Sequence, residues 1–255
     1  MKLSNNQELV CGINAVKEII SIRPRSVLKL FLQDEKQNSR IESLSSLAKK
    51  NHIEIILEED NFFESNFIEQ NHQGVSILCN KRLEENETFL EKLLKKENLL
   101  ILILDHLTDP HNVGACLRSA AAAGADAVIV PKNRSCHLTP TVRKISSGGS
   151  ELMPFIVVTN LNRTIQRLSD SGVKIIGAAA GTGKNHTEID MKGSAAFIIG
   201  SEDKGLKRLT AEKCDTLAAI NMPGGIESLN ASVTAGIILF EYVRQNNHPQ
   251  PYLFI

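Results

Sequence analysis

The strongest constraint on the fold is an unbroken apolar run, Leu99–Leu104, which ends at Asp105. A strand with one wet face alternates apolar and polar residues, whereas a parallel strand covered on both faces is apolar throughout. Further apolar runs follow at 127–130, 155–158, 173–179, 195–199 and 217–220. Helical patterns lie between and after them, at 113–124, 141–146, 161–171, 205–214 and 229–244. This alternation predicts an α/β fold with a parallel sheet that helices cover on both faces.

The chain before this region has a different organisation. We expect helices at 15–20 and 40–51 and strands at 27–32, 53–57 and 75–79. Residues 81–97 are rich in Lys and Glu, as a linker is, and their few apolar residues are spaced for a short amphipathic helix. The sequence therefore predicts a small α/β domain at 1–80, a linker at 81–97 and a larger α/β domain at 98–255.

Composition narrows the class of protein. The chain has 29 Lys and Arg against 29 Asp and Glu, and this balance counts weakly against a nucleic-acid binder. Its five cysteines are scattered and form no CxxC pair, so we expect neither a zinc site nor disulfides. No apolar run approaches the roughly 20 residues of a membrane helix. We therefore expect a cytoplasmic protein that binds no metal and no membrane.

One Gly-rich segment resembles a phosphate-binding loop but lacks its essential parts. In Gly177–Asn185 the first Gly stands one residue too early, and Asn185 replaces the required Ser or Thr. The following residues do not have a helical pattern, although a phosphate cradle needs a helix there. We therefore predict a flexible loop at this position.

Three other segments carry polar residues in an apolar frame. After the strand at 217–220, a Pro-Gly-Gly turn brings Ser228 and Asn230 to the start of the last helix. After the strand at 99–104, Asn112 stands where a helix N-cap is expected, and Arg118 lies among small residues nearly two turns later. An arginine in such surroundings indicates a packed face with a charge to satisfy. We expect the four side chains of these two groups to bind a polar ligand together.

The third segment, Ile199–Gly205, places Gly200, the acidic Glu202 and a second glycine between a strand and a helix. Glycines let a ligand lie against the backbone. The densest basic stretch lies elsewhere in the larger domain, and it is either a solvated loop or a phosphate-binding patch. As a phosphate-binding patch, its members Lys132, Arg134, Arg143 and Lys144 would bind the backbone of a nucleic acid.

Taken in their order along the chain, the three segments resemble the three motifs of the SpoU-type (TrmH-like) RNA ribose methyltransferases. The resemblance is carried by the stretches Asn112–Arg118, Ile199–Gly205 and Met222–Asn230. In the N-terminal part, Cys11–Val16 and His72–Val75 resemble the L30e-like substrate-binding domain of the same family. Within the family, residues 108–112 and 130–135 are most similar to enzymes that methylate a guanosine ribose in the peptidyl-transferase loop of 23S rRNA.

The resemblance implies a trefoil knot in the C-terminal domain, S-adenosylmethionine as methyl donor, and a homodimer. The knot is an exception to the rule that chains are unknotted, and no periodicity could have shown it. By resemblance the cofactor is held largely by backbone groups, at positions that match Ala178, Gly200, Ile220 and Leu229. The resemblance also assigns the catalytic site, made of Arg118, Asn112, Glu202, Ser228 and Asn230.

The family proposal makes Arg118 a general base that acts across the dimer. A guanidinium with a pKa above about 12 rarely gives up its proton, so we expect Arg118 to stabilise the developing alkoxide or to clamp a phosphate. Glu202 would hold Arg118 or a loop, and the remaining polar residues would orient the ribose. Two alternatives stay open from the sequence: a 2′-O-methyltransferase that acts on tRNA, and a non-catalytic assembly factor that binds rRNA.

Overall fold

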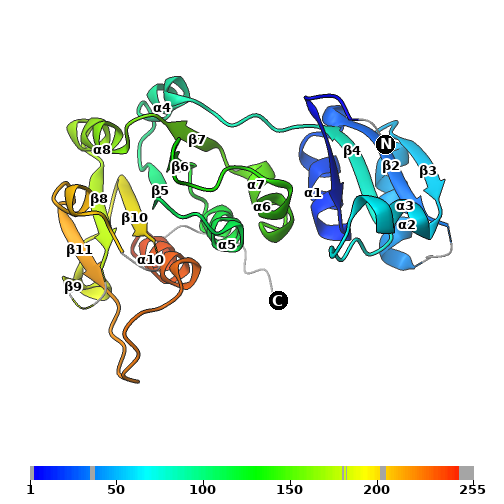
Figure 1. Cartoon of the computed structure of the whole chain (residues 1–255). Coiled ribbons are helices and arrows are strands. Elements are labelled where there is room, and N and C mark those ends of the chain that lie inside the picture. The colour runs from blue at the N-terminus through cyan, green and yellow to red at the C-terminus, as the bar shows by residue number, and fades with distance from the viewer. Residues whose placement is uncertain (1–2, 35–37, 180, 182, 202–204, 247–255) are drawn as a thin grey trace.

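The chain forms two modules, each built on its own β-sheet (Figure 1). The computed structural model describes residues 3–34, 38–179, 181, 183–201 and 205–246. The N-terminal module contains a four-stranded sheet, and the C-terminal module contains a seven-stranded sheet. None of the helices in these ranges is both long enough and apolar enough to cross a membrane.

The N-terminal module is a mixed sheet with the strand order β1-β4-β2-β3. Its strands are β1 (Gln7–Cys11), β2 (Val27–Gln33), β3 (Glu54–Glu58) and β4 (Val75–Asn80). Its helices are α1 (Ile13–Ile22), α2 (Ser39–Lys50) and α3 (Asp60–Asn66), with a 3-10 turn η1 (Pro24–Ser26). Strands β1 and β2 both pair antiparallel with β4, and β2 pairs parallel with β3. The apolar faces of α1 and α2 cover this sheet and form its core.

The C-terminal module is a parallel sheet with the strand order β7-β6-β5-β10-β8-β11-β9. Its strands are β5 (Leu100–Asp105), β6 (Ala127–Pro131), β7 (Phe155–Val158), β8 (Lys174–Ala178), β9 (Lys184–Asn185), β10 (Ala195–Gly200) and β11 (Thr216–Ala219). Its helices are α4 (Glu87–Leu93), α5 (Pro110–Ala122), α6 (Pro140–Ile145), α7 (Gly149–Leu152), α8 (Leu161–Asp170), α9 (Arg208–Ala211) and α10 (Ala231–Gln245), with a 3-10 turn η2 (His186–Glu188).

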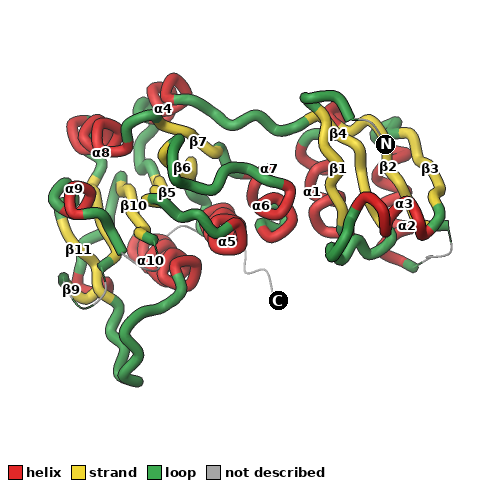
Figure 2. The backbone as a smooth tube through the Cα atoms, viewed as in Figure 1, coloured by secondary structure: helices red, strands yellow, loops and turns green. Residues whose placement is uncertain are grey.

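Helices cover both faces of the larger sheet, as the apolar run in β5 predicts (Figure 2). Leu100, Leu102 and Leu104 pack in one cluster with α5 and α10. Ile101 and Ile103 point the other way, into a cluster with α4 and α8. Because side chains alternate along a strand, this division explains why no residue in the run is polar. All strands run in the same direction, so their carboxyl ends, such as Asp105 beside Gly200, share one edge.

The structure corrects several predicted boundaries. Helix α5 begins at Pro110, and Asp109 is its N-cap because the carboxylate accepts from the backbone N–H of His111. Asn112 therefore lies in the first turn and is not the N-cap. Helix α9 covers only residues 208–211 of the predicted 205–214. Strand β1 and helices α3 and α7 were not predicted.

The two modules meet at a buried cluster of charges. Arg143 of α6 lies with its Nε 3.2 Å from Glu8 Oε2 of β1, and it donates to Glu151 Oε1 of α7 at 3.2 Å. Arg23, which follows α1, donates to the second oxygen of Glu151 at 2.5 Å. The Arg143 and Glu8 side chains are only 3% and 5% exposed. Burial outweighs the nearby arginines and raises the pKa of Glu8.

Candidate active site

A cavity of about 470 Å³ opens at the carboxyl ends of β8, β10 and β11. Its lining is made of small and apolar residues from these strand ends, together with residues that lead into α10. All four positions expected to bind a cofactor lie on its wall: Ala178, Gly200, Ile220 and Leu229. Ser228, expected to be catalytic, lies there too. The structure therefore brings together five residues that are spread over 52 positions of the sequence.

The backbone at Gly200 approaches the following loop so closely that a side chain has no room. A Cβ atom at Gly200 would lie 2.1 Å from the carbonyl carbon of Gly205 and 2.4 Å from the backbone nitrogen of Leu206. Contacts this short with backbone atoms require the chain to move. Gly200 is thus a structural requirement of the cavity wall, since the backbone of Gly205 and Leu206 lies against the strand end.

Two asparagines connect the starts of α5 and α10. The side-chain amide of Asn230 donates to Oδ1 of Asn112 at 2.8 Å. Oδ1 of Asn230 accepts from the backbone N–H of Ser232 at 2.8 Å, so Asn230 is also the N-cap of α10. Since Ser228, Leu229 and Ala231 line the cavity, this pair lies at its rim. The predicted convergence of polar side chains at the start of the last helix is present.

Arg118 lies on α5 two turns beyond Asn112, and its side chain is exposed in the single chain. It forms no ion pair with any residue in the described ranges. The sequence had indicated a packed position. At Arg118 the backbone is packed, whereas the side chain is exposed. There, a Cβ atom on Gly149 would lie 3.0 Å from the Cα of Arg118, so the small residue lets α7 approach the α5 backbone. Glu202, the remaining predicted catalytic residue, lies outside the described residues.

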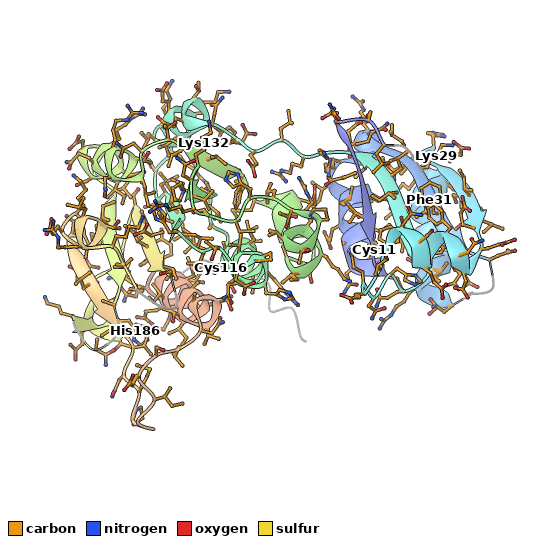
Figure 3. The ribbon with its side chains drawn as sticks, viewed as in Figure 1. Cys11, Lys29, Phe31, Cys116, Lys132 and His186 are labelled. Carbon is orange, nitrogen blue, oxygen red and sulfur yellow. The ribbon has the colours of Figure 1, made fainter. Side chains whose placement is uncertain are left out.

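The four predicted RNA-binding cations do not form one patch. Lys132 and Arg134 are exposed beyond the end of β6, and Figure 3 shows Lys132 in the upper part of the module, away from Cys116 of α5. Arg143 is buried between Glu8 and Glu151, so it is not available to phosphates. Lys144 is half-buried at the junction of the modules. Burial raises the pKa of the Cys11 thiol there, and the charge of Lys144 opposes that effect.

The cavity offers no ionised thiol as a nucleophile. A Cβ atom on Gly177, the residue before Ala178, would lie 2.7 Å from Sγ of Cys214. Burial raises the pKa of Cys214 to about 12, and the carboxylates of Asp215 and Asp105 add to this effect. The thiol is therefore protonated at neutral pH. The site is suited to hold and orient a ligand through shape and backbone groups.

Several lining residues were not predicted as site residues, among them Ala179, Ser201, Leu206, Met222 and Thr234. A signal for most of them exists in the sequence. Residues just beyond the carboxyl ends of parallel strands form the usual binding crevice of such sheets. Ala179 and Ser201 follow β8 and β10 directly, whereas Thr234 reaches the cavity from the first turn of α10.

Comparisons with known proteins agree with this geometry. Residues 99–240 match the SpoU rRNA Methylase family, and residues 9–84 match the family described as RNA 2'-O ribose methyltransferase substrate binding. The chain is 44% identical over 244 residues to the 23S rRNA (guanosine-2'-O-)-methyltransferase RlmB of Coxiella burnetii, covering 95% of this chain and 97% of that protein. It is 41% identical to RlmB of Pseudomonas putida, covering 93% of this chain and 96% of that one.

Solved structures show the same fold at lower identity. The SpoU methyltransferase AviRb from Streptomyces viridochromogenes, in complex with the cofactor AdoMet, superimposes with a TM-score of 0.77 at 22% identity, covering 94% of this chain and 90% of that chain. An AdoMet-bound rRNA methyltransferase from Sinorhizobium meliloti superimposes with a TM-score of 0.76 at 21% identity, covering 94% and 87%. Both modules are included in these superpositions, because the covered share exceeds the length of either one.

Proposed function

The chain belongs to the SpoU rRNA methylase family, and from that premise we propose that it transfers a methyl group from S-adenosylmethionine to the ribose 2′-hydroxyl of a guanosine in 23S rRNA. The observation that carries this proposal is identity of about 40% with several RlmB enzymes over nearly the whole chain. The polar motifs at the strand ends support the same reaction. The peptidyl-transferase loop is the part of 23S rRNA that we infer as the target.

The cavity fits the expected cofactor. Its volume of about 470 Å³ lies in the range of about 300–1,000 Å³ typical of small-molecule sites. Its glycine-containing, mostly apolar wall lets an adenosine moiety lie close to the backbone of the strand ends. We infer that Ala178, Gly200, Ile220 and Leu229 hold S-adenosylmethionine. When bound, this cofactor supplies an electrophilic methyl group.

The polar residues at the rim of the cavity are suited to position the ribose. Asn112, Ser228 and Asn230 carry hydrogen-bonding groups that can fix the orientation of a sugar hydroxyl. Alignment of the hydroxyl with the methyl group is expected to supply much of the rate. Arg118 is suited to stabilise the alkoxide that develops as the hydroxyl proton passes to water, or to hold the neighbouring phosphate. We propose Glu202 as a residue that holds Arg118 or a loop.

We infer that the active form is a homodimer built on α10. Val233 and Phe240 stand seven residues apart on this helix and therefore on the same face, and they are 48% and 50% exposed. Arg118 is exposed on α5, which packs against α10. A second copy of the chain would cover the apolar face of α10, and its Arg118 could then reach the cavity of the first. Such an interface is isologous.

The remaining features of the proposal concern the whole chain. Residues 1–80 would bind the rRNA, joined by the segment 81–97 to the catalytic domain at 98–255. Helix α4 of that segment packs on the larger sheet. The order of the strands supports a trefoil knot. After β8 the chain passes to β9 at the edge of the sheet, then to β10 on the other side of β8, and then to β11 between β8 and β9. An enzyme with this substrate works where ribosomes are assembled, so we place it in the cytoplasm.

The direct test is transfer of labelled methyl from S-adenosylmethionine to RNA, followed by mapping of alkali-resistant 2′-O-methyl sites. Total RNA from a strain that lacks this enzyme should gain one methylguanosine, in 23S rRNA. A methylated tRNA would keep the chemistry and overturn the substrate. Tight RNA binding without transfer to RNA or ribosomal precursors would favour the assembly-factor alternative.

A further inference from the structure

A second cavity, of about 660 Å³, lies on the same edge of the large sheet but beside its other half. It opens at the carboxyl ends of β5, β6 and β7, whereas the candidate cofactor cavity opens at β8, β10 and β11. Leu206 lines the cofactor cavity, and the next residue, Lys207, lines the second one. The two cavities are therefore neighbours on one edge of the sheet, separated by the segment that leads into α9.

Three cationic side chains line the second cavity: Arg134, Lys207 and Arg208. All three residues are exposed to solvent. Arg208 pairs with Glu212 at 2.6 Å, but its side chain is 80% exposed, and such surface pairs contribute little. A ligand with a stronger negative charge can replace that partner. The cavity therefore has the charge expected of an anion-binding site.

The acidic residue that lines the cavity is buried and already has hydrogen-bond partners. Asp105 is only 1% exposed, its Oδ1 contacts Nδ1 of His106, and its Oδ2 accepts from the backbone N–H of Lys207 at 3.3 Å. Nε2 of His106 in turn lies 2.7 Å from Nζ of Lys207. Asp105 thus fixes the position of His106 and Lys207 without presenting its own charge to a ligand.

The backbone of this cavity is held in an unusual conformation at two places. His106 and Arg134 have φ values of +63° and +57°, in the left-handed region that side chains rarely adopt. Such strain persists where the surrounding structure imposes it, and it is concentrated at ligand-binding sites. The Oδ1 atom of Asn162, another lining residue, is buried and accepts no hydrogen bond from the described residues. Its carboxamide can turn its NH2 group toward an anion.

The lining indicates which part of a nucleic acid would bind. Bases are held by stacking on aromatic side chains, and no Phe, Tyr or Trp is found among the described residues of this wall. Arginine, lysine and asparagine are the side chains that contact phosphate oxygens. The chemistry of the cavity therefore favours a phosphodiester over a base.

We infer that this second cavity binds a backbone phosphate of the RNA substrate, next to the nucleotide whose ribose enters the catalytic site. The inference rests on the proposed function, since it places the same RNA on the adjacent cavity. Lys207 and Arg208 would contact that phosphate together with Arg134. This assigns RNA contact to two cations that the sequence motifs do not include.

The experiment compares RNA binding by the full-length protein and its variants. The probe is an unmodified, fluorescently labelled transcript of the peptidyl-transferase loop of 23S rRNA, and its anisotropy is followed at several salt concentrations. Each of Lys207→Gln, Arg208→Gln and Arg134→Gln should weaken binding by about threefold to tenfold. Each should also lower the slope of log K against log salt by about 0.7–0.9, because one phosphate contact is lost.

The controls separate charge from fold. Lys95→Gln removes an exposed lysine that follows α4 and does not line the cavity, and it should change neither the affinity nor the slope. Arg208→Gln is expected to fold normally, because Arg208 is exposed and pairs only with Glu212 among the described residues. Binding of S-adenosylmethionine, measured by calorimetry, should be equal in all four variants.

Three outcomes would overturn the inference. Affinity and slope could stay at the wild-type values in all three cavity variants, or the wild type could fail to bind the transcript. Inorganic phosphate could instead protect the wild type from thermal unfolding, and not the variants, while RNA binding stays the same; the cavity would then hold a free anion. The binding assay does not depend on methyl transfer. Wild-type protein that binds the transcript but methylates no RNA would therefore contradict the proposed function and leave this inference intact.

Discussion

The side-chain amide of Asn230 donates a hydrogen bond to Oδ1 of Asn112 at 2.8 Å, although the two residues are 118 positions apart. The contact fixes the start of α10 against the first turn of α5, at the rim of the cofactor cavity. Asn230 uses its oxygen for a second task, the capping of α10. The Asn230 side chain therefore fixes both the start of α10 and the position of the Asn112 carboxamide.

Asn230→Asp separates these two tasks. The aspartate oxygen can still cap α10, because Asp and Asn are equally good N-cap residues. The NH2 group is lost, and a carboxylate then faces Oδ1 of Asn112, so we expect methyl transfer to fall by at least tenfold with an almost unchanged thermal midpoint. Asn38→Asp, at the N-cap of α2, is the matched control and should keep full activity. Equal activity of the two variants would contradict a role of the Asn112–Asn230 contact.

Gly200→Ala tests the wall of the cofactor cavity. The new Cβ would lie within 2.4 Å of three backbone atoms of Gly205 and Leu206, so the loop after β10 must move. We expect the affinity for S-adenosylmethionine to fall by at least tenfold in calorimetry. At Gly224, which is also close to the site, a Cβ meets no atom within 4 Å, so Gly224→Ala should bind the cofactor normally. Normal binding by both variants would show that the loop is not part of the cofactor site.

The sequence predicted most strands of the large sheet but misplaced the start of α5. The apolar run of β5 fixes its burial, and every strand of the large sheet was predicted except the two-residue β9. The start of α5 was misplaced because Asn112 was interpreted as the N-cap, whereas Asp109 caps the helix and Pro110 occupies its first position. Local signals of turn and N-cap overlap at such a pair.

Long-range charge pairing was the main source of error. Arg143 was predicted to bind RNA because it lies in a basic stretch, but its partners Glu8 and Glu151 come from β1 and α7. No pattern near Arg143 identifies these partners. Strand β1 was missed for a related reason, because its Gln7 and Glu8 are unusual in a buried strand and Glu8 is buried only through the ion pairs.

Arg143→Met is expected to open the contact between the two modules. Among the described residues, the substitution leaves the buried carboxylates of Glu8 and Glu151 with Arg23 as their one remaining ion-pair partner. Breaking a buried pair in this way costs about 3–5 kcal/mol. Limited proteolysis should then cleave the segment between β4 and α4 faster than in the wild type. Arg163→Met, which removes an exposed pair with Glu87, costs at most about 1 kcal/mol and should leave the rate unchanged. Equal cleavage rates in both variants would argue against a structural role of the cluster.

His137 should make the stability of the protein depend on pH. Burial lowers the pKa of His137, but its hydrogen bonds to Glu84 and to the carbonyl of Lys132 outweigh this effect, and the pKa lies above its usual 6.5. The protonated form is therefore favoured in the folded state. Its stabilisation is fully present below pH 6.5 and is lost as the pH rises through the raised pKa.

The thermal midpoint should thus fall as the pH rises above 6.5 and through the raised pKa, and His137→Gln should reduce that fall. His52→Gln serves as the control, because His52 lies in the N-terminal module between α2 and β3. A pH dependence in His137→Gln as steep as in the wild type would assign the effect to other groups.

The proposed dimer requires the apolar face of α10 and predicts that Arg118 acts on the partner's cavity. Phe240 is 50% exposed, and Phe240→Asp would place a charge in the interface. We expect this variant to sediment as a monomer and to lose methyl transfer. Leu57→Asp changes a residue that is 61% exposed in the N-terminal module, and it should remain dimeric and active.

Mixing two inactive variants shows whether the site is shared. Arg118→Ala keeps the cavity but lacks the guanidinium, and Gly200→Ala keeps the guanidinium but lacks the cavity. If Arg118 acts across the dimer, one site of each mixed dimer is complete, and random mixing restores about a quarter of the wild-type sites. If Arg118 acts within its own chain, every site keeps one defect and the mixture stays inactive. Activity of Arg118→Ala alone would show instead that the guanidinium is not needed for methyl transfer.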